Sequence, residues 1–173
     1  QPLLDALADV GLTGLSVSVA HHDEEINQRV MRWKNSKRAV GEETLREVAR
    51  RNSASFESRL SCVMTRESVQ TPEDIVEYLQ WGRSLGFRRF IFRTCSEIPT
   101  EFQKATEYSR YNAANGRSIQ QLAMWFEGRS EFELIFRQRK SDSKVDVFRW
   151  RDLKFDIDES SEEPDPDPKI RRI

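Results

Sequence analysis

A strand–helix–strand unit between residues 58 and 93 constrains this chain more than any other feature. Residues 58–64 and 90–92 are short runs typical of buried strands, and residues 71–86 between them have the spacing of an amphipathic helix. Two strands joined by such a helix run parallel, with a right-handed crossover. The sequence therefore predicts an α/β fold.

The ends of the central helix carry specific signals. Thr71 is suited to cap its first turn together with Asp74, and Pro72 fits the first helical position, where its missing N–H had no partner. Gly86 is suited to the left-handed conformation that ends a helix. In parallel sheets, ligands bind beyond the carboxyl ends of the strands. The search for function is thus directed to residues 20–23, 64–70 and 93–99.

The first residues indicate that the fold begins before them. Residues 1–11 predict an amphipathic helix that leads into a strand at residues 15–20. A helix that precedes a buried strand normally crosses over from an earlier parallel strand. We therefore expect this chain to be the later part of a longer α/β protein.

Three regions follow from the pattern as a whole: a partial (β/α) barrel over residues 1–99, a helix–hairpin extension over residues 100–155, and a disordered acidic tail over residues 156–173. The extension combines helices with an antiparallel β-hairpin. Six of its aromatic residues predict a core between helix and hairpin, rather than a stacking platform for nucleic acid: Trp125, Phe126, Phe132, Phe136, Phe148 and Trp150.

The composition bears on the location of the protein, on nucleic-acid binding and on the state of its cysteines. No apolar run approaches the roughly 20 residues that span a bilayer, so we expect a cytoplasmic protein without membrane contact. The net charge of −1 argues against a nucleic-acid binder that relies on neutralising phosphates. Cys62 and Cys95 have no metal-binding spacing, which favours reduced, buried thiols.

Three consecutive units resemble the later half of a radical S-adenosylmethionine enzyme, most closely the molybdenum-cofactor GTP cyclase type. They are residues 4–23, the segment R-L-S-C-V-M-T at 59–65, and residues 72–93 with P-E-D-I-V-E-Y-L-Q-W-G-R-S-L-G and R-F-I-F-R. The likeness covers residues 3–99. It implies a full-length enzyme that uses S-adenosylmethionine and a 4Fe–4S cluster to generate a 5′-deoxyadenosyl radical that acts on a small-molecule or peptide substrate.

The family's cluster-binding loop, C-x-x-x-C-x-x-C, does not occur in these residues. The cluster ligands are therefore expected upstream, and this segment alone would not be competent. The expected partners are the missing N-terminal half of the barrel and an electron donor such as a ferredoxin or flavodoxin.

Individual positions can be matched to the family. The resemblance implies that Ser18, Ser61 and Thr94 bind the cofactor, and that Arg59 binds substrate through a fork suited to phosphate or carboxylate. Arg93 is a further candidate for the substrate. Ala20 stands where the family has an acidic residue. Ala20 cannot make the contacts to ribose or substrate that the resemblance implies at this position.

Two other classes of function stay open. His21 and His22, followed by Glu24 and Glu25, could mark a metal-dependent barrel enzyme, although adjacent residues on an extended segment point in opposite directions. Alternatively, the chain could be a non-catalytic binding domain built on a barrel remnant.

Overall fold

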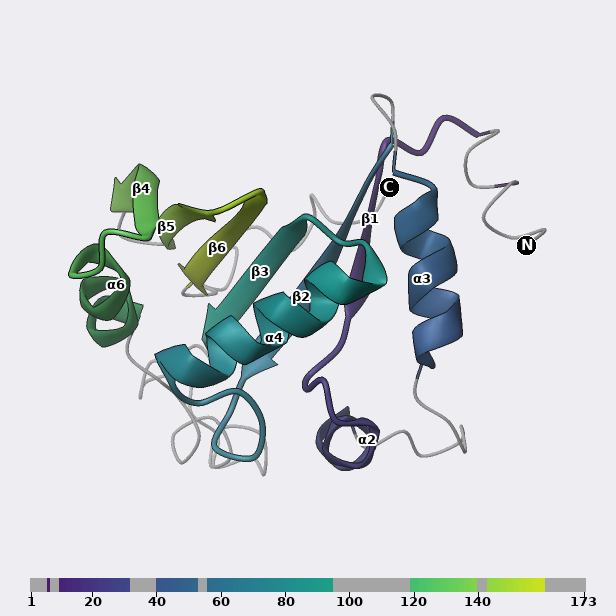
Figure 1. The fold of residues 1–173 in the computed structure, drawn as a ribbon, viewed down its shortest axis with the longest axis horizontal. Coiled ribbons are helices and arrows are strands. Elements are labelled where there is room, and N and C mark those ends of the chain that lie inside the picture. The colour runs from purple at the N-terminus through teal and green to yellow at the C-terminus, as the bar shows by residue number, and fades with distance from the viewer. Residues whose placement is uncertain are drawn as a thin grey trace, which may run out of the picture.

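The computed structural model describes residues 6, 10–31, 40–52, 56–94, 119–139 and 143–160. These residues form a mixed α/β fold with one six-stranded sheet, in the order β1-β2-β3-β6-β5-β4 (Figure 1). The helix predicted over residues 1–11, Cys95, the first part of the predicted extension (residues 100–118) and residues 161–173 lie wholly or mostly outside the described residues.

The first three strands are parallel neighbours in chain order, as predicted. They are β1 (Gly14–Ser18), β2 (Glu57–Met64) and β3 (Arg89–Thr94). Along β2 and β3, Leu60, Cys62, Met64, Phe90 and Phe92 point to one face of the sheet, the apolar face. Most of the charged and hydroxyl side chains point to the other face, together with Val63 and Ile91.

The helix between β2 and β3 begins and ends where its signals predict. In α4 (Pro72–Leu85), the Thr71 hydroxyl accepts from the backbone N–H of Asp74, whose carboxylate accepts from the N–H of Thr71. Gly86 ends the helix with a φ of 107°, a left-handed conformation that favours glycine. The helix lies on the apolar face of the sheet with Ile75, Leu79 and Leu85 buried.

The C-terminal strands extend this same sheet. β4 (Phe132–Arg139) and β5 (Ser143–Trp150) pair antiparallel, which confirms the predicted hairpin. The third strand, β6 (Leu153–Ser160), was not predicted. It pairs antiparallel with β5 and parallel with β3.

The disordered tail predicted from Asp156 is therefore wrong for residues 156–160, which belong to β6. The acidic character of the segment masked a regular alternation in which Phe155 and Ile157 are buried, whereas Asp156 and Asp158 point to the other face. That two-residue period is the signature of a half-buried strand.

Three helices cover the apolar face: α3 (Glu42–Arg50), α4 and α6 (Ile119–Glu127) (Figure 1). α2 (Glu24–Met31) lies instead near the carboxyl end of β1. Its first turn is capped by Asp23, whose carboxylate accepts from the N–H of Ile26 at 2.9 Å.

The aromatic residues of the extension form part of the core, with one exception. Phe126 of α6 packs on Phe132, Phe148 and Phe155, with ring centroids 4.9–5.5 Å apart. Phe136 was expected in this core but is 52% exposed. A register shift between Leu134 and Phe136 places Phe136 opposite Val147, so the strand's alternation is interrupted there.

Candidate functional site

The face of the sheet away from α3, α4 and α6 carries the polar residues of four parallel strands, and we refer to it as the polar face. In-register neighbours in a parallel sheet point to the same side. One row runs from Ser16 through Arg59 and Arg89 to Lys154, and the next from Ser18 through Ser61 and Ile91 to Asp156. A third row holds Val63, Arg93 and Asp158.

Four of the five predicted site residues share this face. Ser18 is the register partner of Ser61, with Ser18 exposed and Ser61 3% exposed. Arg59 lies one row toward the amino ends of the strands and Arg93 one row toward their carboxyl ends. Hydroxyl groups and guanidinium groups thus meet on one surface.

Thr94, the fifth predicted residue, lies on the other side of the sheet. It follows Phe90 and Phe92 on the helix-covered face and is opposite Met64. Its hydroxyl is buried and has no hydrogen-bond partner in the described part of the chain. Thr94 is near the carboxyl end of β3, but its side chain does not join the two serines.

The polar face also contains three charged residues that form ion pairs there and were not predicted as site residues: Arg89, Asp156 and Asp158. Arg89 donates to Asp156, with Nη2 3.2 Å from Oδ2, and Arg93 Nε lies 3.7 Å from Asp158 Oδ2. The side chains of Arg89, Asp156 and Asp158 are 14–20% exposed. The alternation of residues 153–158 could have identified both aspartates as neighbours on one side of a strand.

Burial shifts the pKa values of both aspartates. It raises the pKa of Asp156, although Arg89, Lys154 and Arg59 act in the opposite direction. It also raises the pKa of Asp158, against the influence of Arg93. Titratable groups with raised pKa values in a partly buried cluster are typical of sites that bind ligands or exchange protons.

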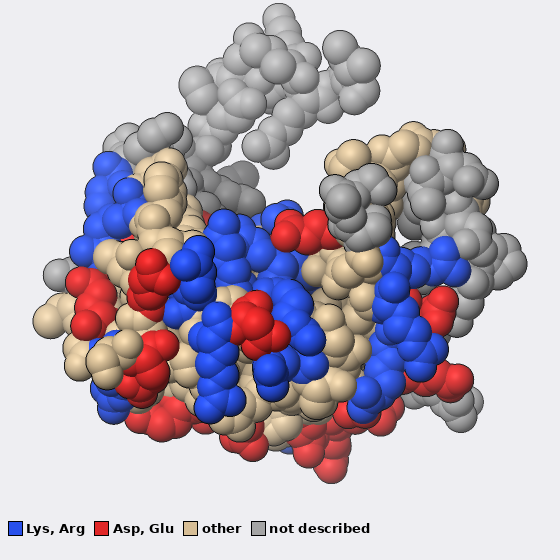
Figure 2. Space-filling model, turned by 45° about the horizontal axis from the view of Figure 1, so that its top comes forward, with Lys and Arg blue, Asp and Glu red and all other residues tan. Residues whose placement is uncertain are grey.

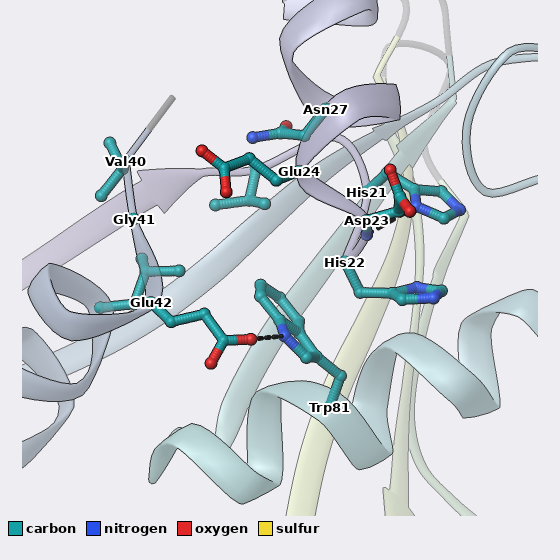
Figure 3. Close-up of a pocket in the computed structure, with 11 residues that line it drawn as sticks. His21, His22, Asp23, Glu24, Asn27, Val40, Gly41, Glu42 and Trp81 are labelled. Atoms are coloured by element: carbon teal, nitrogen blue, oxygen red, sulfur yellow. Dashed lines mark hydrogen bonds between the residues drawn. The ribbon is translucent and has the colours of Figure 1, made fainter. Parts of the chain in front are cut away.

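A separate pocket of about 460 Å³ lies at the carboxyl end of β1, between α2, α3 and α4 (Figure 3). Glu42 and Trp81 lie next to each other in its wall, and the indole N–H donates to the Glu42 carboxylate at 3.0 Å. Asp23 and Glu24 add two more carboxylates. The pocket is therefore acidic and has one aromatic wall.

The two histidines at this pocket stack on each other, with ring centroids 4.2 Å apart. His21 Nδ1 accepts from the N–H of Asp23 at 2.9 Å, and His22 Nε2 lies 3.4 Å from Glu77. Burial, followed by the neighbouring His22, lowers the pKa of His21. The described residues contain no group of three or more His, Cys, Asp or Glu side chains arranged to hold a metal ion.

Cys62 points to the helix-covered face and is fully buried. Its thiol donates to the carbonyl of Ala20 at 3.3 Å, and burial raises its pKa far above the ordinary value for cysteine. A buried thiol that stays protonated is not a metal ligand or nucleophile, since both roles need the thiolate.

Charge on the outside of the molecule is mixed. Figure 2 shows Lys and Arg side chains interspersed with Asp and Glu across the face it presents. None of the helices within the described ranges has the length and hydropathy needed to span a bilayer.

Comparisons of the chain with protein-family models, with curated proteins and with solved structures give no match.

Proposed function

We propose that this chain is the carboxyl-terminal part of a radical S-adenosylmethionine enzyme, and that its polar face lines the interior where cofactor and substrate bind. The observation that carries the proposal is the position of Ser18, Ser61, Arg59 and Arg93 on one face of consecutive parallel strands. The family resemblance implies a ligand-binding role for these same four residues.

The strand order supports the same proposal. β1, β2 and β3 are adjacent in chain order, and α4, which connects β2 to β3, lies on the apolar face. Successive strands of a (β/α) barrel are arranged in this way, with the helices on the outer face of the sheet and the other face directed to the interior. A doubly wound sheet would instead reverse its strand order and place helices on both faces.

The described residues fit one of the two implied cofactors. S-adenosylmethionine offers a carboxylate, an amine and ribose hydroxyls, and the hydroxyls of Ser18 and Ser61 can both donate to and accept from such groups. Once bound with the cluster, this cofactor supplies the radical that begins the reaction. The 4Fe–4S cluster does not fit these residues, because Cys62 is buried on the opposite face as a neutral thiol.

The roles that follow belong to this chain's own side chains. Ser18 and Ser61 orient the cofactor at the centre of the polar face. Arg59 holds an anionic group of the substrate on one side of them, and Arg93 contacts the substrate on the other side. Because Ser61 is almost fully buried while Ser18 is exposed, Ser61 fixes the deeper part of the ligand.

The first test is binding of S-adenosylhomocysteine, a stable analogue, to the whole chain by isothermal titration calorimetry. Replacing Ser18 or Ser61 by Ala is expected to weaken binding about tenfold, the usual effect of one lost hydrogen bond. Ser84→Ala is the matched control, because that hydroxyl donates to Trp81 on the exposed side of α4. Equal affinity in all three variants would contradict the proposal.

A second test uses the gene. The proposal requires a C-x-x-x-C-x-x-C motif in the same reading frame upstream of the codon for Gln1. An upstream frame without that motif would remove the radical chemistry and favour a binding domain on the same fold.

A further inference from the structure

The carboxylates of β6 lie on the same surface as the predicted substrate-binding arginines. β6 belongs to the C-terminal part of the chain, well beyond β3 in sequence. Its parallel pairing with β3 sets Asp156 opposite Ile91 and Asp158 opposite Arg93. β6 therefore adds acidic groups to a surface that the first three strands supply with serines and arginines.

The polar groups of this surface are only partly satisfied. Three buried atoms have no hydrogen-bond partner in the described part of the chain: Arg89 Nη1, Asp156 Oδ1 and Asp158 Oδ1. A buried polar atom without a partner costs on the order of 1–3 kcal/mol, so such atoms are rare. Three of them on one surface indicate hydrogen bonds that a ligand would complete.

The charges on this surface have a definite arrangement. Asp156 and Asp158 each face one arginine, whereas Arg59 and Lys154 make no ion pair with another residue in the described ranges. Both of these cations lie in the row nearer the amino ends of the strands. An anionic ligand group would be attracted to that row. Hydrogen-bond donors of the ligand would be attracted to Asp156, one row further along, and to Asp158, two rows further along.

We propose that the polar face binds a small molecule with an anionic group at one end and an amine or similar N–H donor at the other. Arg59 and Lys154 hold the anionic group, and the free oxygens of Asp156 and Asp158 accept from the donor. This inference rests on the proposed function only in taking that molecule to be the substrate.

The test measures binding of simple probes to the whole chain by isothermal titration calorimetry. The probes are O-phosphoethanolamine, β-alanine, inorganic phosphate and ethylamine. We expect at least one of the two double-ended probes to bind about ten times more tightly than either phosphate or ethylamine, the effect of one added hydrogen bond. O-phosphoethanolamine and β-alanine together distinguish a phosphate from a carboxylate as the anionic group.

Variants assign the two ends of the ligand. Asp156→Asn and Asp158→Asn should each remove most of the advantage of the double-ended probe while leaving phosphate affinity unchanged. Arg59→Gln should weaken phosphate and O-phosphoethanolamine by the same factor. Asp152→Asn is the matched control, because Asp152 pairs with Arg83 and Arg88 in the turn before β6.

Two results would overturn the inference. The first is that neither double-ended probe binds. The second is that Asp156→Asn and Asp158→Asn, both folded, still bind the double-ended probe more tightly than phosphate or ethylamine by the same factor as the unmodified chain. Circular dichroism establishes that each variant is folded. If Asp156→Asn does not fold, the binding test is made with Asp158→Asn alone. If a probe binds as expected but S-adenosylhomocysteine does not, the radical-enzyme proposal fails and the ligand site stands.

Discussion

The hydroxyl of Tyr78 donates a hydrogen bond of 2.9 Å to the backbone carbonyl of Val19, 59 residues earlier in the chain. Tyr78 is on α4 and fully buried, and Val19 directly follows β1. The bond fixes the carboxyl end of β1 against the helix between β2 and β3. It therefore positions Ser18 relative to the strand that carries Ser61.

Tyr78→Phe tests this connection. The substitution keeps the buried ring but leaves the Val19 carbonyl without its donor, so we expect a loss of about 1–2 kcal/mol in the free energy of unfolding. Urea denaturation measures it. Ser84→Ala removes an exposed hydrogen bond from the same helix and should cost less. An equal loss in the two variants would show that the Tyr78 bond has no special role.

Gly82 permits the close contact of α4 with the sheet. A Cβ added there would lie 2.4 Å from a ring carbon of Phe90 and 3.0 Å from a methyl group of Leu60. We expect Gly82→Ala to destabilise the fold by about 1–3 kcal/mol, the usual cost of overpacking a core. Gly128→Ala, with no contact closer than 3.6 Å, is the control, and the thermal midpoints of the two variants should differ clearly.

Asp146 is a buried ion-pair centre on β5. Its side chain is 0% exposed and accepts from Arg137 and Arg139 at 2.9 and 2.7 Å, and Arg137 also pairs with Glu127 of α6. Burial alone would raise the pKa of Asp146, but the hydrogen bonds from Arg139 and Arg137 hold it below the ordinary value. This group therefore stabilises the fold above the pKa of an unfolded aspartate.

That contribution should be lost as the pH falls below about 4 and through the lowered pKa of the folded state. Asp146→Asn should cost about 1–3 kcal/mol at pH 7, because Arg139 and Arg137 lose the carboxylate that they share, while Arg137 keeps its pair with Glu127. Urea denaturation at pH 7 and pH 3 measures both effects. A difference between wild type and variant that stays constant with pH would contradict the assignment.

Ionisation of Asp156 affects the stability of the fold in the opposite direction from ionisation of Asp146. Because burial raises its pKa in the folded state, its ionisation opposes folding, and stability falls as the pH rises from the pKa of an unfolded aspartate through that raised value. We expect Asp156→Asn to stabilise the chain at pH 7 by about 0.5–2 kcal/mol, as often happens when a functional group is removed from a site. Urea denaturation measures the gain, which should vanish at a pH below the pKa of an unfolded aspartate.

Asp152→Asn controls for the loss of a negative charge. The hydrogen bond from Arg83 lowers the pKa of Asp152, so its removal should not stabilise the chain at any pH. If Asp152→Asn and Asp156→Asn changed stability in the same direction at pH 7, burial of Asp156 would not be the cause.

Local signals predicted the parts of this protein that depend on neighbouring residues in the sequence. Thr71, Asp74 and Gly86 fix the ends of α4 through contacts within a few residues. Their roles can therefore be predicted from the sequence alone. Alternation of apolar residues identified β2 and β3, and the link through α4 made them parallel. The same alternation put Ser61 and Arg59 on one side of a strand.

The sequence by itself determined the three parallel strands, the caps of α4, the hairpin and the candidates Ser18, Ser61, Arg59 and Arg93. The tertiary structure alone decided that β6 pairs with β3, which brings Asp156 and Asp158 to the polar face, and that Thr94 points away from it. The physical reason is range: caps and periodicity act between near neighbours, whereas strand pairing depends on which hydrogen-bonding edges meet in space.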